Sequence, residues 1–200
     1  MNARVPERLS GRLLIATPVI DDDTFLRAVI LVVNHTDDGS LGVVLNRPTA
    51  DPVADTLPRW QDLASHPSVV FEGGPVDPTT GLALGLVKDL DAFAGGSNQP
   101  ADAEIAARVP GMSGLVTVNL DGDPAFAAAY IEHMRMFSGY AGWSGGQLAG
   151  EIIAGAWFVV DGALDDVFTE QPDDLWPNIL KRQPGATRWF ANYPRDPAVN

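Results

Sequence analysis

The apolar residues of this chain fall into short runs separated by turn-forming residues. The longest run of aliphatic residues, 28–33, is far below the ~18 residues that a membrane-spanning helix requires. Short apolar runs bounded by Gly, Pro, Asn and Asp are typical of buried strands. We therefore expect a domain rich in strands, with no membrane segment.

The clearest strand pair lies near the N-terminus. Residues 13–16 form a first apolar run that ends before Pro18, and residues 27–35 and 41–46 form two more. The sequence Asp38-Gly39 between them favours the positive φ angles of a tight hairpin turn. Both runs are almost continuously apolar, which predicts burial on both faces and a place in the centre of the sheet. Later runs at 69–71, 82–86, 115–118, 136–140 and 157–160 predict further strands.

Helices are predicted where a capping residue precedes a helix-forming segment. Asp51-Pro52 and Asp123-Pro124 each combine an N-cap with proline at the first helical position, the latter before residues 125–134. Ser144 and Gln147 fit a capping box for a helix that stops at Gly155, and residues 175–182 predict a last helix.

Strands and helices thus alternate irregularly, with at least one hairpin. This pattern predicts a single α+β domain with a mixed, largely antiparallel sheet and flanking helices. Its core spans about residues 12–182, and residues 183–200 form a C-terminal tail that is either docked or frayed. The stretch 95–100 reads as a flexible loop.

Charge and cysteine content exclude several classes of function. The 200 residues carry a formal net charge of -13, which disfavours direct binding to nucleic acid or to an anionic membrane. The chain has no cysteine, which excludes disulfides, thiolate zinc sites and thiol catalysis. We expect a cytoplasmic protein.

No pattern in the sequence indicates a metal or a cofactor. The three histidines, His35, His66 and His133, share no metal-ligand spacing, and the common nucleotide-binding fingerprints are absent. His35 is of interest because it follows a buried strand beside the Asp-Gly turn. We expect no metal site and no cofactor.

The segment 142–146 matches the Gly-x-Ser-x-Gly pattern of hydrolase nucleophile elbows. No histidine follows His133, so Ser144 lacks the downstream base of that family, and the capping box explains the serine more simply. The glycine-rich turn also precedes a helix N-terminus, which can hold an anion. Two interpretations stay open: an anion-binding turn made of Gly142, Ser144, Gly145 and Gly146, or a tight turn that needs small residues.

Several motifs together resemble those of the bacterial YqgE/AlgH family. They cover roughly residues 12–182 in order: residues 11–18, 23–29, His35, 42–48, 73–76, 139–143 and 146–148, then Glu151 and Trp157. Members of that family usually read Gly-Trp-Gly-Pro-Gly-Gln-Leu-Glu where this chain has Ser144, Gly145 and Ala149. A family glycine in place of Ser144 argues further against a nucleophilic serine.

The resemblance implies a cytoplasmic, single-domain α+β protein with a link to transcriptional regulation and no established enzymatic activity. Its motifs fall at predicted strand ends and turns, where binding sites are usually built. We therefore hypothesise that Asn46, Arg47, Tyr140, Trp143 and Gln147 border one pocket or partner groove, with Arg47 as an anchor for anions. The alternative is that these residues only fix turns and helix packing.

The function expected from the sequence is a regulatory or adaptor role through contacts with protein partners. The alternative is a small-molecule or anion-binding protein, or an enzyme, that uses a pocket near Arg47 and Trp143. Direct nucleic-acid binding conflicts with the charge.

Overall fold

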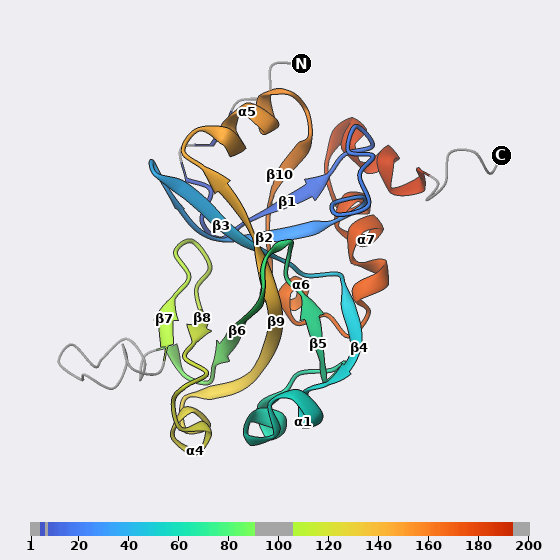
Figure 1. Ribbon diagram of the computed structural model, residues 1–200. Helices are drawn as coiled ribbons and strands as arrows, with labels where there is room; N and C mark the ends of the chain where they lie inside the picture. The colour runs from blue at the N-terminus through green and yellow to red at the C-terminus, as the bar shows by residue number, and fades with distance from the viewer. Residues whose placement is uncertain (1–4, 7, 91–105, 194–200) are drawn as a thin grey trace.

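The computed structural model describes residues 5–6, 8–90 and 106–193, and strands dominate its architecture (Figure 1). Its 10-stranded curled sheet runs in the order β10 (Trp157–Asp161), β1 (Arg12–Ala16), β2 (Val29–Thr36), β3 (Gly39–Val44), β9 (Ile131–Ser144), β6 (Val76–Val87), β8 (Leu115–Val118) and β7 (Ala106–Arg108). A branch adds β4 (Pro48–Pro52) and β5 (Val69–Glu72), and among the strand pairs of the described residues only β5–β9 is parallel. The predicted α+β class with a mixed, largely antiparallel sheet is confirmed.

The long strand β9 connects the two halves of this sheet (Figure 1). Its last residues pair with β3, and the rest of the strand pairs with β6. The sequence predicts a helix over 125–134, but α4 (Pro124–Ala127) ends early and β9 begins at Ile131. Met134 and Met136 are buried opposite Gly85 and Ala83 of β6, so tertiary pairing overrides local helix propensity.

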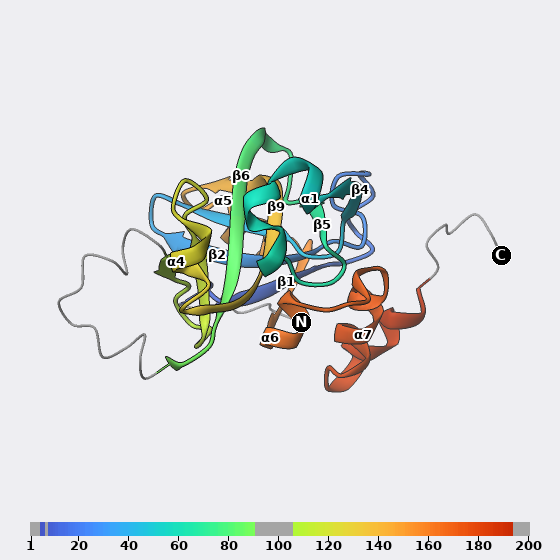
Figure 2. The ribbon, with the colours of Figure 1, turned by 90° about the horizontal axis from the view of Figure 1, so that it is seen from below.

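The helices are short and lie around the sheet. They are α1 (Val53–Thr56), α4, α5 (Gln147–Ile153), α6 (Leu164–Val167) and α7 (Leu175–Lys181), with 3-10 helices η1 (Pro58–Leu63), η2 (Pro172–Asp174) and η3 (Gly185–Asn192). Figure 2 shows α1 and the α6–α7 pair on opposite sides of β5 and β9. In the part of the chain that the structure describes, no helix is long and apolar enough to cross a membrane.

Capping residues were predicted with mixed success. The Asp123 carboxylate accepts a hydrogen bond from the Ala125 amide at 3.0 Å, which confirms that cap. The start predicted at Asp51-Pro52 is wrong by one residue, because Asp51 and Pro52 lie in β4 and α1 begins at Val53, with Pro52 as N-cap and no side-chain cap. Helix α5 ends before Gly155, whose φ of 85° makes it the predicted stop.

The β2–β3 hairpin forms as predicted, but for a different reason. Thr36 lies opposite Gly39, so the turn residues are Asp37 and Asp38. Neither of these two residues nor Gly39 has a positive φ. Gly39 is instead extended at the start of β3. A Cβ on Gly39 would lie 2.6 Å from the Trp143 carbonyl oxygen, so glycine is needed there for close approach of β9.

One buried cation sits at the centre of the fold. The Arg135 side chain of β9 is 2% exposed, and its guanidinium donates to the carbonyl oxygens of Val167 at 2.8 Å, Thr169 at 2.8 Å and His66. Its Cζ lies 4.4 Å from the centre of the Phe71 ring. Burial lowers the pKa of Arg135 to about 10, which still leaves it charged at neutral pH. Arg135 therefore ties two loops to the sheet.

Apolar residues on both sides of the sheet complete the core. Trp176 of α7 packs with one face of β1, β2 and β3, whereas Trp143, Leu148 and Trp157 pack with the opposite face under α5.

The predicted loop at 95–100 lies outside the described residues. Of the predicted tail, η3 is described, and Phe190 packs against Phe158 of β10 with ring centroids 5.3 Å apart.

Candidate functional site

The loop between β1 and β2, residues 17–28, contributes side chains to two cavities. We call the first the indole cavity; it measures about 420 Å³ and is lined by Ile20, Asp22, Thr24, Phe25, Pro75, Gly142, Trp143, Gln147, Glu151, Ala156 and Trp157. We call the second the arginine cavity; it measures about 260 Å³ and is lined by Asp23, Leu26, Arg27, Asn46, Arg47, Asp173 and Trp176.

Glu151 is the polar centre of the indole cavity. Its Oε2 accepts hydrogen bonds from the indole N–H groups of Trp143 at 2.9 Å and Trp157 at 2.8 Å. Its Oε1 accepts one from the Gln147 amide at 3.0 Å. Strand β9, strand β10 and helix α5 therefore each supply a side chain to the carboxylate, which fixes its orientation.

Aromatic rings surround this carboxylate at steep angles to one another. The Trp143 and Trp157 ring centroids are 6.2 Å apart with an 84° angle between planes, and Phe25 meets Trp157 edge-on at 5.7 Å. Such T-shaped contacts are the favoured geometry for aromatic pairs. The indole cavity is thus rigid and has aromatic walls.

The turn before α5 is held by the same group of residues. Gln147 Oε1 accepts from both the amide and the hydroxyl of Ser144, each at 3.1 Å. The predicted capping box is therefore only half correct: the glutamine satisfies the serine amide, but the N-cap residue is Gly146, and the serine hydroxyl does not cap the helix.

In the arginine cavity the polar side chains bond mainly to the backbone. Asn46 accepts from the Val29 amide at 2.9 Å and donates to the Arg27 carbonyl at 3.0 Å. Arg47 donates to the carbonyl oxygens of Asp23 at 2.9 Å and Leu26 at 3.4 Å. Arg27 lies 4.2 Å above the Trp176 ring. These residues fix the β1–β2 loop.

Comparison with known proteins places this arrangement in a family. The AlgH-like family model matches residues 13–188. The chain belongs to the AlgH-like family. A UPF0301 protein of Thermobifida fusca is 44% identical over 193 residues, 96% of each chain, and one of Streptomyces coelicolor is 45% identical over 192 residues, covering 96% of this chain and 95% of the relative.

Two solved structures share the AlgH-like fold. A Corynebacterium diphtheriae protein superposes with a TM-score of 0.83 at 28% identity and covers 95% of each chain. The AlgH protein of Pseudomonas aeruginosa, solved in solution, gives a TM-score of 0.62 at 25% identity over 92% of this chain and 99% of that one. None of these names states an activity, so the site has to be interpreted from its own chemistry.

The structure of this AlgH-like chain divides the hypothesised pocket residues between two places. Asn46 and Arg47 line the arginine cavity, whereas Trp143 and Gln147 line the indole cavity. Tyr140 lines neither of them; it pairs with Val76 in the sheet and packs on the core. In the hypothesised anion-binding turn, Gly145 packs closely on the Asp37 carbonyl and Gly146 has a φ of 77°.

Three residues at the centre of the indole cavity were not among those predicted to line a site. Glu151 and Trp157 belong to the resemblance motifs but were given no role, and Phe25 lies within another motif. Asp22 also lines the cavity, and its carboxylate accepts from the Phe25 amide at 3.0 Å. Glu151 and Trp157 are six residues apart and meet across the turn between α5 and β10, whereas Phe25 reaches Trp157 from the β1–β2 loop through the long-range pairing of β10 with β1.

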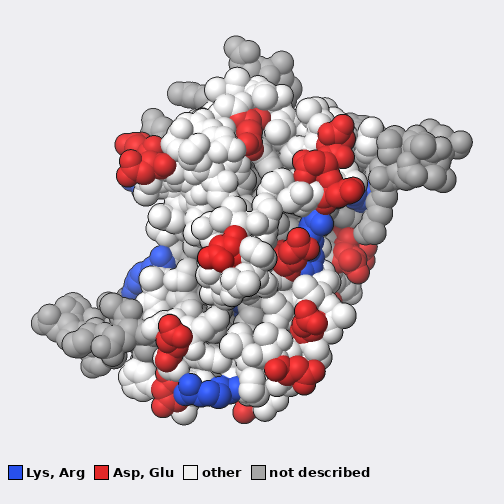
Figure 3. Space-filling model, in the orientation of Figure 1, with Lys and Arg blue, Asp and Glu red and all other residues white. Residues whose placement is uncertain are grey.

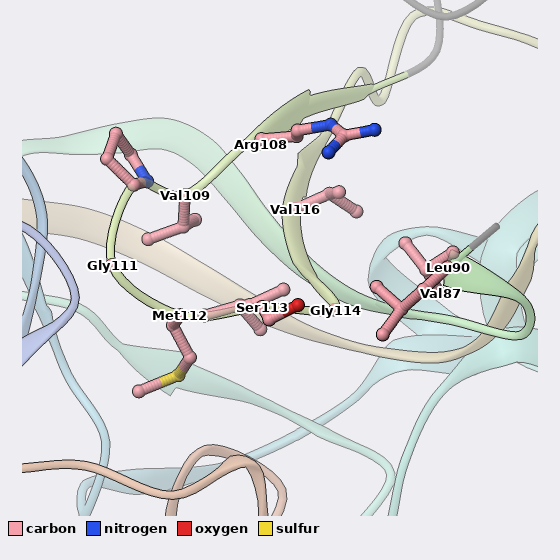
Figure 4. Close-up of a pocket in the computed structure, with 11 residues that line it drawn as sticks. Val87, Leu90, Arg108, Val109, Gly111, Met112, Ser113, Gly114 and Val116 are labelled. Carbon is pink, nitrogen blue, oxygen red and sulfur yellow. The ribbon is translucent and has the colours of Figure 1, made fainter. Parts of the chain in front are cut away.

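A third cavity, of about 380 Å³, has few polar side chains in its lining (Figure 4). Its lining is mostly backbone and apolar side chains of the turn at residues 109–114, with Arg108 and Ser113 as its polar groups. Near α6, another of about 420 Å³ contains His133, which meets Phe168 edge-on at 4.7 Å. The indole cavity is distinguished from both by its converging hydrogen bonds.

The structure also places the residues that were considered for catalysis and metal binding. His35 Nδ1 lies 2.7 Å from the Ser40 hydroxyl across the β2–β3 hairpin, and neither residue lines any of the four cavities above. Ser144 contacts Gln147 rather than a histidine. Among the described residues, no group of three or more His, Asp or Glu side chains is arranged to hold a metal ion.

Proposed function

We propose that this AlgH-like protein is a cytoplasmic regulatory adaptor that binds protein partners at the indole cavity and its rim. One observation carries the proposal: two strongly exposed apolar side chains flank an aromatic cavity. Val19 is 69% exposed and Ile153 is 68% exposed. Exposed apolar groups beside a cavity with polar groups inside are typical of protein interaction sites.

Hydrogen bonds to the backbone bring together the two segments that carry these side chains. The Thr17 amide donates to the Ala156 carbonyl at 3.0 Å, and the Thr17 hydroxyl donates to the Gly155 carbonyl at 2.7 Å. The segment that carries Val19 therefore lies against the turn that follows Ile153. Val19 is next to the lining residue Ile20, and Ile153 is three residues before the lining residue Ala156, so we infer that both lie around the mouth of the cavity, at its rim.

The lining of the indole cavity supports binding rather than catalysis. Thr24 supplies its only hydroxyl, and no serine, histidine or lysine is among its lining residues. Glu151 already accepts three hydrogen bonds from neighbouring side chains, which suits a fixed recognition group better than a mobile proton carrier.

An affinity experiment tests the adaptor proposal. The protein and its Ile153→Asp variant are used to capture partners from native cytoplasm, and captured proteins and metabolites are both identified. We expect a protein that binds saturably when purified and that is lost with Ile153→Asp. Phe126→Asp is the matched control, because Phe126 is also exposed, at 43%, but lies on α4 at the far end of the molecule (Figure 1). Equal capture by both variants would refute the proposal.

The surface charge argues against direct nucleic-acid binding. Figure 3 shows acidic groups spread over one face of the molecule, with basic groups in small separate patches. With a net charge of -13, the protein is expected not to retard duplex DNA at low salt. Tight, salt-sensitive retardation in a mobility-shift titration would contradict this part of the proposal.

A second candidate function is anion binding at the arginine cavity, because two guanidinium groups line it. Arg27 and Arg47 are both present there, but Asp23 and Asp173 line the same cavity. The acidic pair weakens the attraction for a phosphate or carboxylate ligand. This candidate predicts phosphate binding that is lost in Arg47→Ala, as discussed below.

A further inference from the structure

We propose that the indole cavity recognises a positively charged side chain, the guanidinium or ammonium group of an arginine or lysine on the protein partner. This inference deepens the proposed adaptor function and rests on it. Four properties of the cavity support it: the sign of its charge, the remaining hydrogen-bonding capacity of Glu151, its aromatic walls and its apolar rim.

The charge of the cavity has one sign. Asp22 and Glu151 are the only charged residues among those that line it, and no arginine, lysine or histidine is included. Within the described part of the chain, neither Asp22 nor Glu151 takes part in an ion pair, so neither cavity carboxylate is neutralised in that way. A cation entering the cavity would supply the missing counter-charge.

Glu151 retains capacity to bind it. A carboxylate offers about four acceptor positions, and Trp143, Trp157 and Gln147 occupy three of them. All three donors are neutral N–H groups, so they orient the carboxylate without cancelling its charge. One acceptor position is left for a charged donor, and such charge-assisted bonds are about twice as strong as neutral ones.

The aromatic walls favour the same class of ligand. Phe25, Trp143 and Trp157 line the cavity with their rings at 76° and 84° to one another. The electron-rich faces of Trp and Phe attract cations, with Trp the strongest of the side chains. The cavity therefore brings three aromatic rings and a carboxylate into one small volume.

The rim indicates that the cation belongs to a protein rather than to a free amine. Val19 and Ile153 would have no contact with a small polar cation in the cavity, whereas apolar neighbours of a basic side chain would cover them. Arginine at the centre of an interface, surrounded by apolar contacts that exclude water, is a common binding hot spot.

Small-molecule probes test the charge preference directly. N-butylguanidinium and its neutral isostere N-butylurea are titrated separately, and the indole N–H signals of the five tryptophans are followed by NMR. We expect butylguanidinium to shift the Trp143 and Trp157 signals, with those of Trp60, Trp176 and Trp189 as internal references. Binding of butylguanidinium should be at least about 10-fold tighter than that of the urea, as expected for one charged contact.

Variants then locate the charge. Glu151→Gln should weaken butylguanidinium binding by about 10-fold or more, and Asp22→Asn by about 3-fold, because each removes one negative charge from the cavity. Asp173→Asn removes the same charge from the arginine cavity and should have no effect on this binding. Asp22→Asn keeps the oxygen that bonds the Phe25 amide, so it remains a valid test if Glu151→Gln disturbs the fold. Equal binding of urea and guanidinium, or unchanged binding in both cavity variants, would overturn the inference.

Peptides distinguish a partner side chain from a free amine. An apolar pentapeptide with a central arginine should bind about 10-fold more tightly than butylguanidinium, lose that advantage with Ile153→Asp, and lose binding when citrulline replaces the arginine. A peptide that binds no better than butylguanidinium would overturn the assignment to a protein side chain. If a captured partner depends on Ile153 but citrulline peptides bind equally well, the cation inference fails while the adaptor proposal stands.

Discussion

The two cavities beside the β1–β2 loop contain charged side chains used in opposite ways. In the arginine cavity, the guanidinium of Arg47 bonds to backbone carbonyls of the loop, and that of Arg27 lies over Trp176. In the indole cavity, Glu151 bonds only to side chains and keeps an uncompensated charge. One cavity therefore holds the loop in shape, and the other presents a charge to a ligand.

Removal of Trp176 should have the largest effect, because its side chain is the floor of the arginine cavity and part of the core. It is 2% exposed, and its indole N–H donates to the Ala16 carbonyl at 2.9 Å. Trp176→Ala should lower the free energy of unfolding by about 3–5 kcal/mol, measured by urea denaturation. Trp189→Ala, at a side chain 65% exposed, should stay within about 0.5 kcal/mol. A loss below about 1 kcal/mol for Trp176→Ala would show that this cavity is not built into the core.

Removal of the Asn46 side chain should have the next largest effect. Asn46→Ala leaves the amide of buried Val29 without its acceptor and the Arg27 carbonyl without its donor. We expect a loss of about 1–3 kcal/mol in the free energy of unfolding. Asn46→Asp keeps the acceptor for Val29 and should lose less. Butylguanidinium binding at the indole cavity should not change in either variant; a change there would mean that the two cavities are not independent.

The arginine cavity itself is tested by Arg47→Ala. Loss of the bonds to the Asp23 and Leu26 carbonyls should lower the free energy of unfolding by about 0.5–1.5 kcal/mol. Titration of inorganic phosphate, followed by calorimetry, should show no binding that depends on Arg47. If wild-type protein binds phosphate and Arg47→Ala does not, the comparison breaks down, and the arginine cavity is a ligand site as in the second candidate function.

The sequence predicts the fold better than it predicts the site. Short apolar runs correctly indicate strands such as β1 and β8, because an apolar run and the turn residues that bound it are both local in the sequence. The start of β9 could not be predicted, since residues 125–134 favour a helix and only pairing with β6 makes Ile131 begin a strand. The buried role of Arg135 is likewise determined by carbonyl groups far away in the sequence.

The candidate site is only partly visible in the sequence for the same reason. The glycine-rich turn and Trp143 draw attention to the start of α5, where Gln147 does contact Glu151. Trp157 follows Glu151 by six residues, but its contacts with Trp143 and Phe25 depend on strand pairing in the sheet, such as that of Trp157 with Ala16, which no spacing rule reveals. Asn46 and Arg47 fall into the other cavity because their partners lie on the opposite side of the loop.

The smallest effect is expected at Ser144, beside the indole cavity. Its hydroxyl donates to Gln147 and is exposed, so Ser144→Ala should change the free energy of unfolding by no more than about 0.5 kcal/mol.

Because no histidine is bonded to the Ser144 hydroxyl, we expect no covalent labelling of this serine by a fluorophosphonate probe. Ser40, 2.7 Å from His35 Nδ1, is the matched position, and Ser40→Ala distinguishes the two serines if labelling occurs. Labelling that disappears only in Ser144→Ala would make the indole cavity part of a catalytic site. Its fixed carboxylate would then have to be reinterpreted as a group that binds or orients a substrate.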